Sequence, residues 1–246
     1  MRVAAETETR PAFYALAAGG WRDYLTLLHA PYTAWHVAYV AIGAALSPEF
    51  RLSRLLPTLA AFFLAVGIGA HALDELRGRP LQTRIPTPVL AALAVVSITG
   101  AAAIGIVGAL VASPWIGLFA AAGTFIVVAY NLELFGGRFH GDFWFALAWG
   151  SFPALTGFFA VAEELDEAAV GAAGFAFALS LAQRRLSSRV RDVRRRVARV
   201  SGTVERRDGS AQRLTTDDLM DVEEGALRAL AAATVALAAA LVMMRL

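Results

Sequence analysis

Long apolar runs separated by short charged segments make up most of the chain. A helix that crosses a membrane needs about twenty mainly apolar residues, and seven segments approach that pattern. They are Tyr32 to Leu46, Leu55 to Leu73, Pro88 to Ala112, Trp115 to Tyr130, Phe143 to Ala162, Ala168 to Ala182 and Ala226 to Met244. The pattern predicts an all-α, polytopic integral membrane helical bundle of about seven transmembrane helices, with residues 1–246 forming a single membrane domain.

Two segments outside these runs have patterns of their own. Residues 11–30 are aromatic and amphipathic, which indicates either an interfacial lead-in helix or a turn before a longer first span. Residues 183–225 are basic, and apolar residues at helical spacing from Leu186 to Val200 predict a cytoplasmic extension of the sixth helix. Asp208-Gly209 lies between two short alternating segments and predicts a β-hairpin in this region.

Composition supports a membrane protein and orients it. Hydrophobic residues are 58% and charged residues 17% of the 246, against about 45–50% and 25% in soluble domains. The 22 basic residues are all arginine, and cytoplasmic loops carry the positive excess. Seven spans with the N-terminus inside leave only Arg51, Arg54 and Arg245 outside the cytoplasm. We expect a multi-pass plasma-membrane protein with a cytoplasmic N-terminus and an external C-terminus.

The residue types that the chain or its segments lack exclude several kinds of site and function. The chain has no cysteine, which excludes disulfides, thiolate metal sites and cysteine nucleophiles. The basic stretch from Arg184 to Arg199 adjoins a span and lacks interleaved aromatic residues. We therefore expect it to contact anionic lipid headgroups or a substrate phosphate, and not nucleic acid. No span has a central charged residue, which disfavours a small transporter.

The main candidate site is the segment from His71 to Pro86, which interrupts two apolar runs with charged residues. Asp74 and Glu75 offer oxygen ligands for Mg²⁺. Guanidinium groups bind phosphate oxygens in pairs, and the arginines placed to bind a diphosphate are Arg77, Arg79 and Arg84. The alternative is a cytoplasmic loop whose arginines anchor the membrane edge and form local ion pairs.

The loop of residues 131–142 is expected on the same cytoplasmic face. Arg138 is a candidate phosphate contact, and Tyr130, which ends the fourth span, is a candidate pocket residue. The alternative is a plain connection between two helices. Inside the spans, His36 and aromatic residues such as Trp149 either line an isoprenoid cavity or pack the helices.

A weaker metal site lies before the last apolar run. Asp217 and Asp221 are four residues apart, so on a helix they share one face. The alternative assigns the acidic residues to the start of the last helix, capped by Thr215 or Thr216, because carboxylates favour the positive end of a helix dipole.

Two stretches resemble the UbiA-type intramembrane prenyltransferase superfamily in the arrangement of its helices. Residues 24–46, YLTLLHAPYTAWHVAYVAIGAAL, resemble the opening helix of that family, with His29 where an arginine is usual. Residues 130–150, YNLELFGGRFHGDFWFALAWG, resemble the middle of the fold, where a tyrosine ends the fourth helix.

A third stretch, HALDELRGRPL, resembles the first aspartate-rich motif of that superfamily. His71 takes the position of the asparagine, and Glu75 and Arg79 take those of the two aspartates. The second aspartate-rich motif, at the end of the sixth helix, is replaced by AQRRLSSRVRD at residues 182–192. Residues 217–225 offer the only substitute, and the chain has seven predicted spans where the family has nine.

The resemblance implies Mg²⁺ as cofactor and, besides membrane lipids, two partners: a prenyl diphosphate and a lipophilic acceptor. We expect transfer of the prenyl group between these two, or a non-catalytic membrane protein on the same scaffold that binds a lipid or isoprenoid or docks a partner. The sequence identifies no catalytic residue. Whether the chain is an enzyme stays open at this point.

Overall fold

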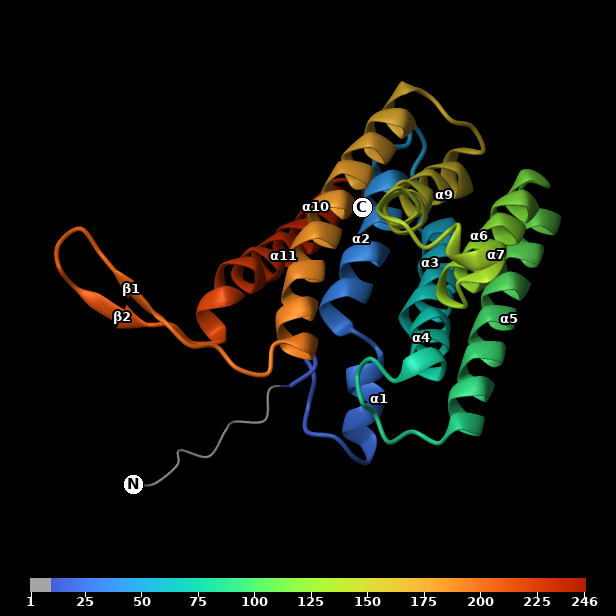
Figure 1. The fold of residues 1–246 in the computed structure, drawn as a ribbon. Coiled ribbons are helices and arrows are strands. Elements are labelled where there is room, and N and C mark those ends of the chain that lie inside the picture. Colours follow the sequence, from blue (N-terminus) through green and yellow to red (C-terminus); the bar gives the residue numbers. More distant parts are fainter. Residues whose placement is uncertain (1–9) are drawn as a thin grey trace.

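The computed structural model describes residues 10–246, so Arg2, which the arginine pattern places in the cytoplasm, lies outside the described residues. Helices dominate the described part (Figure 1). The long ones are α2 (Ala30–Leu46), α5 (Thr87–Val111), α6 (Trp115–Asn131), α10 (Glu167–Arg196) and α11 (Asp221–Met243). Two further long helices each contain a π-helical segment: α3, η1 and α4 (Leu52–Phe62, Phe63–Ala70, His71–Gly78), and α8, η2 and α9 (Asp142–Ala146, Leu147–Ser151, Phe152–Ala162).

The seven apolar segments are all helical, which confirms the all-α prediction. Within residues 10–246, four helices are long and apolar enough to cross a membrane: Leu52–Gly78, Thr87–Val111, Asp142–Ala162 and Asp221–Met243. These apolar helices indicate a membrane-associated protein. α6 is apolar but shorter.

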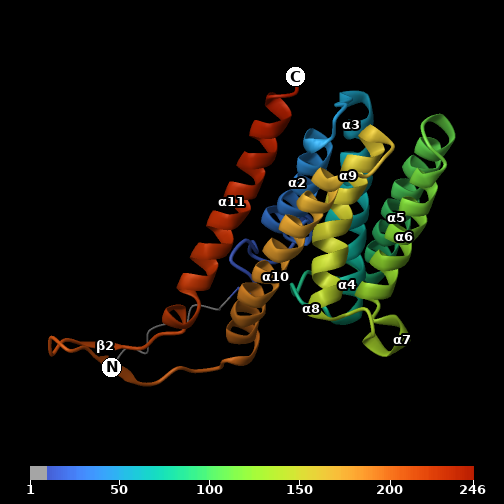
Figure 2. The ribbon, with the colours of Figure 1, turned by 90° about the horizontal axis from the view of Figure 1, so that it is seen from above.

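The interior of the bundle is built on close contact between α2 and α9. A Cβ atom added to Gly43 would lie 2.0 Å from the carbonyl oxygen of Ala154, and one added to Gly157 would lie 2.1 Å from that of Val40. Only glycine permits this approach, as at many helix contacts in membranes. On α2, Trp35 and Tyr39 are fully buried, and Trp35 Nε1 donates to the Tyr39 hydroxyl at 2.6 Å. α11 lies against the other side of α2, at the edge of the bundle (Figure 2).

The segments outside the apolar runs follow the predictions in part. The predicted lead-in helix is reduced to α1 (Trp21–Leu27). α10 continues to Arg196, which confirms the extension of the sixth helix. The hairpin is also present, with β1 (Thr203–Glu205) antiparallel to β2 (Ala211–Arg213), and it projects away from the helices (Figure 1 and Figure 2).

The threonine predicted to cap the last helix instead caps the short turn before it, where the Thr215 hydroxyl accepts a hydrogen bond from the Asp218 amide at 3.3 Å. The Asp218 carboxylate accepts hydrogen bonds from the Thr215 amide and hydroxyl, each at 2.7 Å, within the turn that includes η3 (Asp217–Leu219). α11 begins at Asp221 without a side-chain cap. The hydrogen bonds from Thr215 lower the pKa of the exposed Asp218, so this carboxylate is ionised near neutral pH and orders the turn before the helix.

The two ends of the bundle have different sets of polar contacts. At one end Arg245 donates to the carbonyl oxygens of Ser47 and Pro48, and Arg54 pairs with Glu163. At the opposite end the loops after α4 and α6 and the last part of α10 come together, joined by side-chain contacts such as Arg77 with Glu133 and Arg184 with Asp142. The polar segments expected to share one face therefore do so. The short α7 (Leu134–Gly137) lies within the loop after α6.

Candidate functional site

A polar cavity of about 790 Å³ opens at the end of the bundle where these loops meet. The first residues of the described chain, the start of α2, α4 and its following loop, the end of α6 and the inner side of α10 form its wall. Six arginines line it: Arg77, Arg79, Arg184, Arg191, Arg194 and Arg195. Two carboxylates, Asp74 and Glu133, line it as well. We call this space the polar cavity, and its positive excess favours an anionic ligand.

Three of the six arginines are engaged in holding the wall. Arg77 donates to the Leu132 carbonyl and pairs with Glu133, both at 2.7 Å. Arg79 donates to the carbonyl oxygens of Thr83 and Ile85, at 3.0 and 2.7 Å. Arg194 pairs with Glu224 of α11 at 2.6 Å. The main role of these guanidinium groups is to hold neighbouring segments together. They also add positive charge to the cavity.

The other three come from one face of α10 and have weaker partners. Arg184 Nε lies 3.1 Å from the exposed carboxylate of Asp142, and its guanidinium lies over the Phe145 ring. Arg191 donates only to the hydroxyls of Ser187 and Ser188, and within residues 10–246 neither it nor Arg195 has a carboxylate within 4.0 Å. Burial, and then repulsion by Arg184 and Arg195, lower the pKa of Arg191. The cavity therefore contains guanidinium charge that the described protein does not balance.

The two carboxylates assigned to Mg²⁺ do not come together. Asp74 lines the polar cavity. Glu75 is fully buried behind it, where its oxygens accept hydrogen bonds from the Leu81 amide at 3.0 Å and from the Thr83 amide and hydroxyl at 2.8 Å. Consecutive residues on a helix point in different directions, and Glu75 is occupied in closing the loop that follows α4.

Of the other predicted site residues, some line the polar cavity and the others do not. Tyr130 lines the polar cavity, as do Arg77 and Arg79. Arg84 is exposed, and its backbone amide donates to Asp23 at 2.8 Å. The remaining candidates are exposed and do not line the cavity: Arg138, Asp217 and Asp221. The structure therefore does not bring Asp217 and Asp221 to Asp74, and a search of residues 10–246 finds no cluster of three His, Asp or Glu side chains able to hold a metal.

Neutral polar groups complete the wall. The rings of His29 and His71 lie 3.9 Å apart, and burial together with His71 holds the pKa of His29 well below its usual range. The Tyr130 hydroxyl and the side-chain oxygen of Gln183 are buried and have no hydrogen-bond partner among the described residues. Buried polar groups normally find a partner, so these two atoms indicate a place for a polar ligand.

Backbone strain is concentrated at this cavity. Among the described residues, six that are not glycine have positive φ, and four of them line the polar cavity: His29, Arg79, Gln82 and Glu133, with φ between 45° and 56°. Each such residue costs about 1–3 kcal/mol, and strain of this kind collects at functional sites. No sequence pattern announces these conformations, because none of the four is glycine or asparagine.

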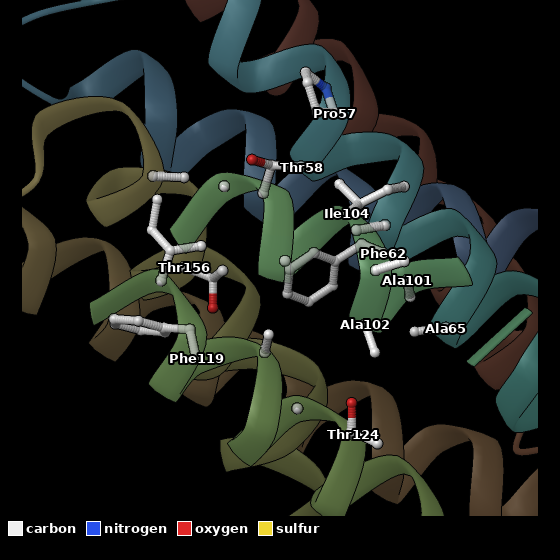
Figure 3. Close-up of a pocket in the computed structure, with 18 of the residues that line it drawn as sticks. Pro57, Thr58, Phe62, Ala65, Ala101, Ala102, Ile104, Phe119, Thr124 and Thr156 are labelled. Atoms are coloured by element: carbon white, nitrogen blue, oxygen red, sulfur yellow. The ribbon is translucent and has the colours of Figure 1, made fainter. Parts of the chain in front are cut away.

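An apolar cavity of about 650 Å³ lies deeper in the bundle, between α3, α5, α6 and α9. Figure 3 shows Phe62, Ala102 and Phe119 around this space. Thr58 and Thr156 also lie at its wall, but their hydroxyls donate to carbonyl oxygens of their own helices at 2.8 and 2.7 Å. Apart from Ser53 and Arg54 at one end, the wall is therefore mainly hydrocarbon and suits an apolar chain. We call it the apolar cavity.

The two cavities adjoin at Val66 and Trp149, which line both. Val66 belongs to η1 and Trp149 to η2, the two π-helical segments. The Trp149 carbonyl accepts a hydrogen bond from His36 Nδ1 at 2.7 Å. Insertions of this type are frequent at functional sites. Val66 and Trp149 therefore mark the boundary between the polar cavity and the apolar cavity.

A comparison of the chain with protein-family models, curated proteins and solved structures finds no match to any of them. The UbiA-like arrangement thus remains a hypothesis based on short motifs, and a function must be argued from the two cavities. Sequence reasoning assigned the α10 arginines to lipid or phosphate without choosing among them, and it gave no role to Val66 or Gln183. Their places depend on which face of a helix meets which neighbour.

Proposed function

We propose that this protein is a UbiA-like membrane protein that binds a prenyl diphosphate and transfers its prenyl group to a lipophilic acceptor. The observation that carries the proposal is the junction at Val66 and Trp149 between the polar cavity and the apolar cavity. An amphiphile with an anionic head and a hydrocarbon chain fits both spaces at once. Burial of the chain contributes about 0.8 kcal/mol per CH₂ group.

Residues at the junction suit the chemistry of prenyl transfer. The bond between the first chain carbon and the diphosphate oxygen breaks, and the diphosphate leaves with both electrons. A new bond forms between that carbon and the acceptor, which then releases a proton. The ring centroid of Tyr130 lies 5.4 Å from that of Trp149 and 6.2 Å from that of Phe145, and such ring faces stabilise a developing cation.

The polar cavity supplies the stabilisation of the leaving group. Guanidinium groups fixed in a partly dehydrated space favour the charge that develops on a departing diphosphate. The Mg²⁺ that the resemblance implies does not fit the donors present, because Glu75 is turned into its own loop and Asp74 lies among arginines. The proposal therefore assigns leaving-group stabilisation to the arginines.

The same proposal includes seven membrane spans, with the polar cavity on the cytoplasmic side of the plasma membrane. It is supported by the arginine-rich loops that gather at one end of the bundle, while Arg51, Arg54 and Arg245 lie at the other. The positive-inside rule gives this orientation. A non-catalytic carrier of the same ligand is the second candidate, and it is favoured by the position of Glu75, whose carboxylate is buried in the loop after α4 and does not line the polar cavity.

The test compares three probes on the purified protein in nanodiscs: farnesyl diphosphate, inorganic pyrophosphate and farnesol. We expect farnesyl diphosphate to bind at least tenfold more tightly than either, because only it occupies both cavities. Ala102→Trp should fill the apolar cavity (Figure 3) and weaken farnesyl diphosphate without weakening pyrophosphate. Ala91→Trp, on an exposed position of the same helix, is the matched control.

Transfer is tested by incubating the protein with labelled farnesyl diphosphate and a total membrane lipid extract. A labelled lipid product that requires the folded protein supports the enzyme. Binding without a product favours the carrier. Equal affinity for farnesyl diphosphate and farnesol would contradict both, because the polar cavity would then have no part in binding.

A further inference from the structure

We propose that three arginines of α10, Arg184, Arg191 and Arg195, hold the phosphate or diphosphate group of the ligand directly, without a divalent metal ion. The inference deepens the proposed function, on which it rests, by naming the residues that recognise the anion. It also departs from the expectation of Mg²⁺ that the sequence resemblance raised.

The first support is the placement of the three side chains. Arg191 follows Arg184 by seven residues and precedes Arg195 by four, a spacing that keeps all three on one face of a helix. All three line the polar cavity. A continuous helix of 30 residues, Glu167–Arg196, carries them, so their mutual spacing is set by a rigid element and not by a loop.

The second support is the charge that has no partner. Arg194 is balanced by Glu224, whereas the described residues give Arg191 only two serine hydroxyls. Arg184 and Arg195 repel the charge of Arg191. Three guanidinium groups kept close together are unfavourable in the empty protein when their one carboxylate partner within 4.0 Å is the exposed Asp142, which contacts Arg184. A phosphate group, with about 1.5 to 2 negative charges near pH 7, removes this repulsion and accepts paired hydrogen bonds from each guanidinium.

The third support is a hydrogen-bond donor without an acceptor. The Tyr130 hydroxyl is buried, lines the same cavity and has no partner in the described part of the chain. A phosphate oxygen is an acceptor for that proton. The side-chain oxygen of Gln183 in the same cavity also has no partner among the described residues, but it is an acceptor, so it needs a donor and does not support a phosphate oxygen.

The oxygen donors of the polar cavity and its positive charge both disfavour a metal ion. Mg²⁺ sites with phosphate substrates generally use one or two carboxylates. Asp74 is the one cavity carboxylate without an ion pair within residues 10–246, because Glu133 pairs with Arg77. The arginines that line the cavity already exceed its carboxylates by four. A further divalent cation would add repulsion where the anion is already neutralised.

The experiment measures binding of inorganic pyrophosphate and farnesyl diphosphate to the full chain in phosphatidylcholine nanodiscs, in buffer with EDTA and in buffer with Mg²⁺. We expect affinities in the two buffers to agree within threefold. Arg191→Gln should weaken both probes at least tenfold, and Arg191→Lys should weaken them less because it keeps the charge but not the paired geometry. Arg196→Gln is the matched control, since that side chain is 83% exposed and should change neither affinity.

Each other outcome has a distinct meaning. Binding that requires Mg²⁺ overturns the metal-free inference and leaves the proposed function standing. Binding in EDTA that Arg191→Gln leaves unchanged, with the variant shown to be folded by its unfolding temperature, overturns the assignment of Arg191. Failure of both probes to bind in either buffer, without protection of the chain by phosphatidic acid, overturns the inference and the proposed function together.

A lipid headgroup is the other source of the same phosphate chemistry. Nanodiscs that contain phosphatidic acid serve as the competing arm. If phosphatidic acid protects the wild-type chain against unfolding, Arg191→Gln abolishes that protection, and neither diphosphate probe binds, then the arginines recognise a phospholipid. That result keeps the arginine assignment and overturns the prenyl diphosphate function.

Discussion

Two arginines of α10 that both line the polar cavity are in opposite situations. Arg194 is paired with Glu224 of α11 at 2.6 Å, and the two side chains are only 11% and 5% exposed. Arg191 lies three residues earlier and has only serine hydroxyls as partners among the described residues. The residue type and the helix are the same. The difference lies in what the neighbouring element supplies.

The difference separates a structural role from a binding role. A buried ion pair whose partner is removed leaves an uncompensated charge, so the Arg194 contact is needed for folding. A cation without a partner destabilises the empty protein and gains from an anion. Proteins often accept such a defect at a functional site. The two roles can be tested by removing the partner of Arg194 in one variant and the charge of Arg191 in another. Stability and ligand binding are then measured on both variants.

Loss of the α10–α11 ion pair should give the largest effect. Glu224→Ala leaves Arg194 buried and unpaired, and it also removes the contact of Glu224 with Arg228 at 3.3 Å. We expect the free energy of unfolding to fall by about 3–5 kcal/mol, measured by denaturant titration in detergent.

The control for this prediction is on the same helix. Glu223→Ala removes a pair with Arg189 at 3.5 Å whose side chains are 25% and 63% exposed, and it should cost at most about 1 kcal/mol. The double change Arg194→Met with Glu224→Leu should recover most of the lost stability. If Glu224→Ala and Glu223→Ala had equal effects, burial would not make the Arg194 ion pair more important for stability than the exposed pair of Arg189.

The loop after α4 should give the second largest effect. Glu75→Gln keeps one carbonyl oxygen for the two Thr83 donors but turns an amide group toward the Leu81 N–H. A buried donor left without an acceptor costs about 1–3 kcal/mol. Hydrogen exchange at Leu81 and Thr83 should therefore accelerate. Unchanged stability and exchange, together with a loss of Mg²⁺-dependent binding, would instead make Glu75 the metal ligand that the sequence pattern indicated.

The sequence predicted the helices far better than the cavity. Apolar runs located all seven long helical segments, and Asp208-Gly209 located the hairpin, because both patterns depend on local physics. The pattern also placed Tyr130, Arg77 and Arg79 at one site, because it assigned the loops after the second and fourth apolar runs to the same end of the bundle. It could not tell that Glu75 would turn away from Asp74, since that depends on the loop that its carboxylate closes.

The role of the α10 arginines was also beyond the sequence. Arg191 and Arg194 belong to one basic stretch, and nothing local distinguishes them. The distinction comes from Glu224, thirty residues later than Arg194, which reaches only one of the two. The π-helical segments at Val66 and Trp149 likewise follow from packing and have no motif. Sites made by the contact of distant elements are therefore the part that the sequence leaves open.

The smallest effect on the free energy of unfolding is expected for a change at Arg191. Whether that change raises or lowers the stability is the sharpest test of the difference between Arg191 and Arg194. Arg191→Gln removes a partly buried cation whose pKa is lowered by burial and by repulsion from Arg184 and Arg195. Because the folded state disfavours the charged form at every working pH, the empty variant should be more stable than wild type, by up to about 1 kcal/mol. A ligand at a hundredfold excess over its Kd adds about 2.7 kcal/mol of stability. Pyrophosphate should therefore raise the unfolding temperature of the wild type well above that of the variant, whereas a destabilised variant that still responds to pyrophosphate would show that Arg191, like Arg194, serves the fold.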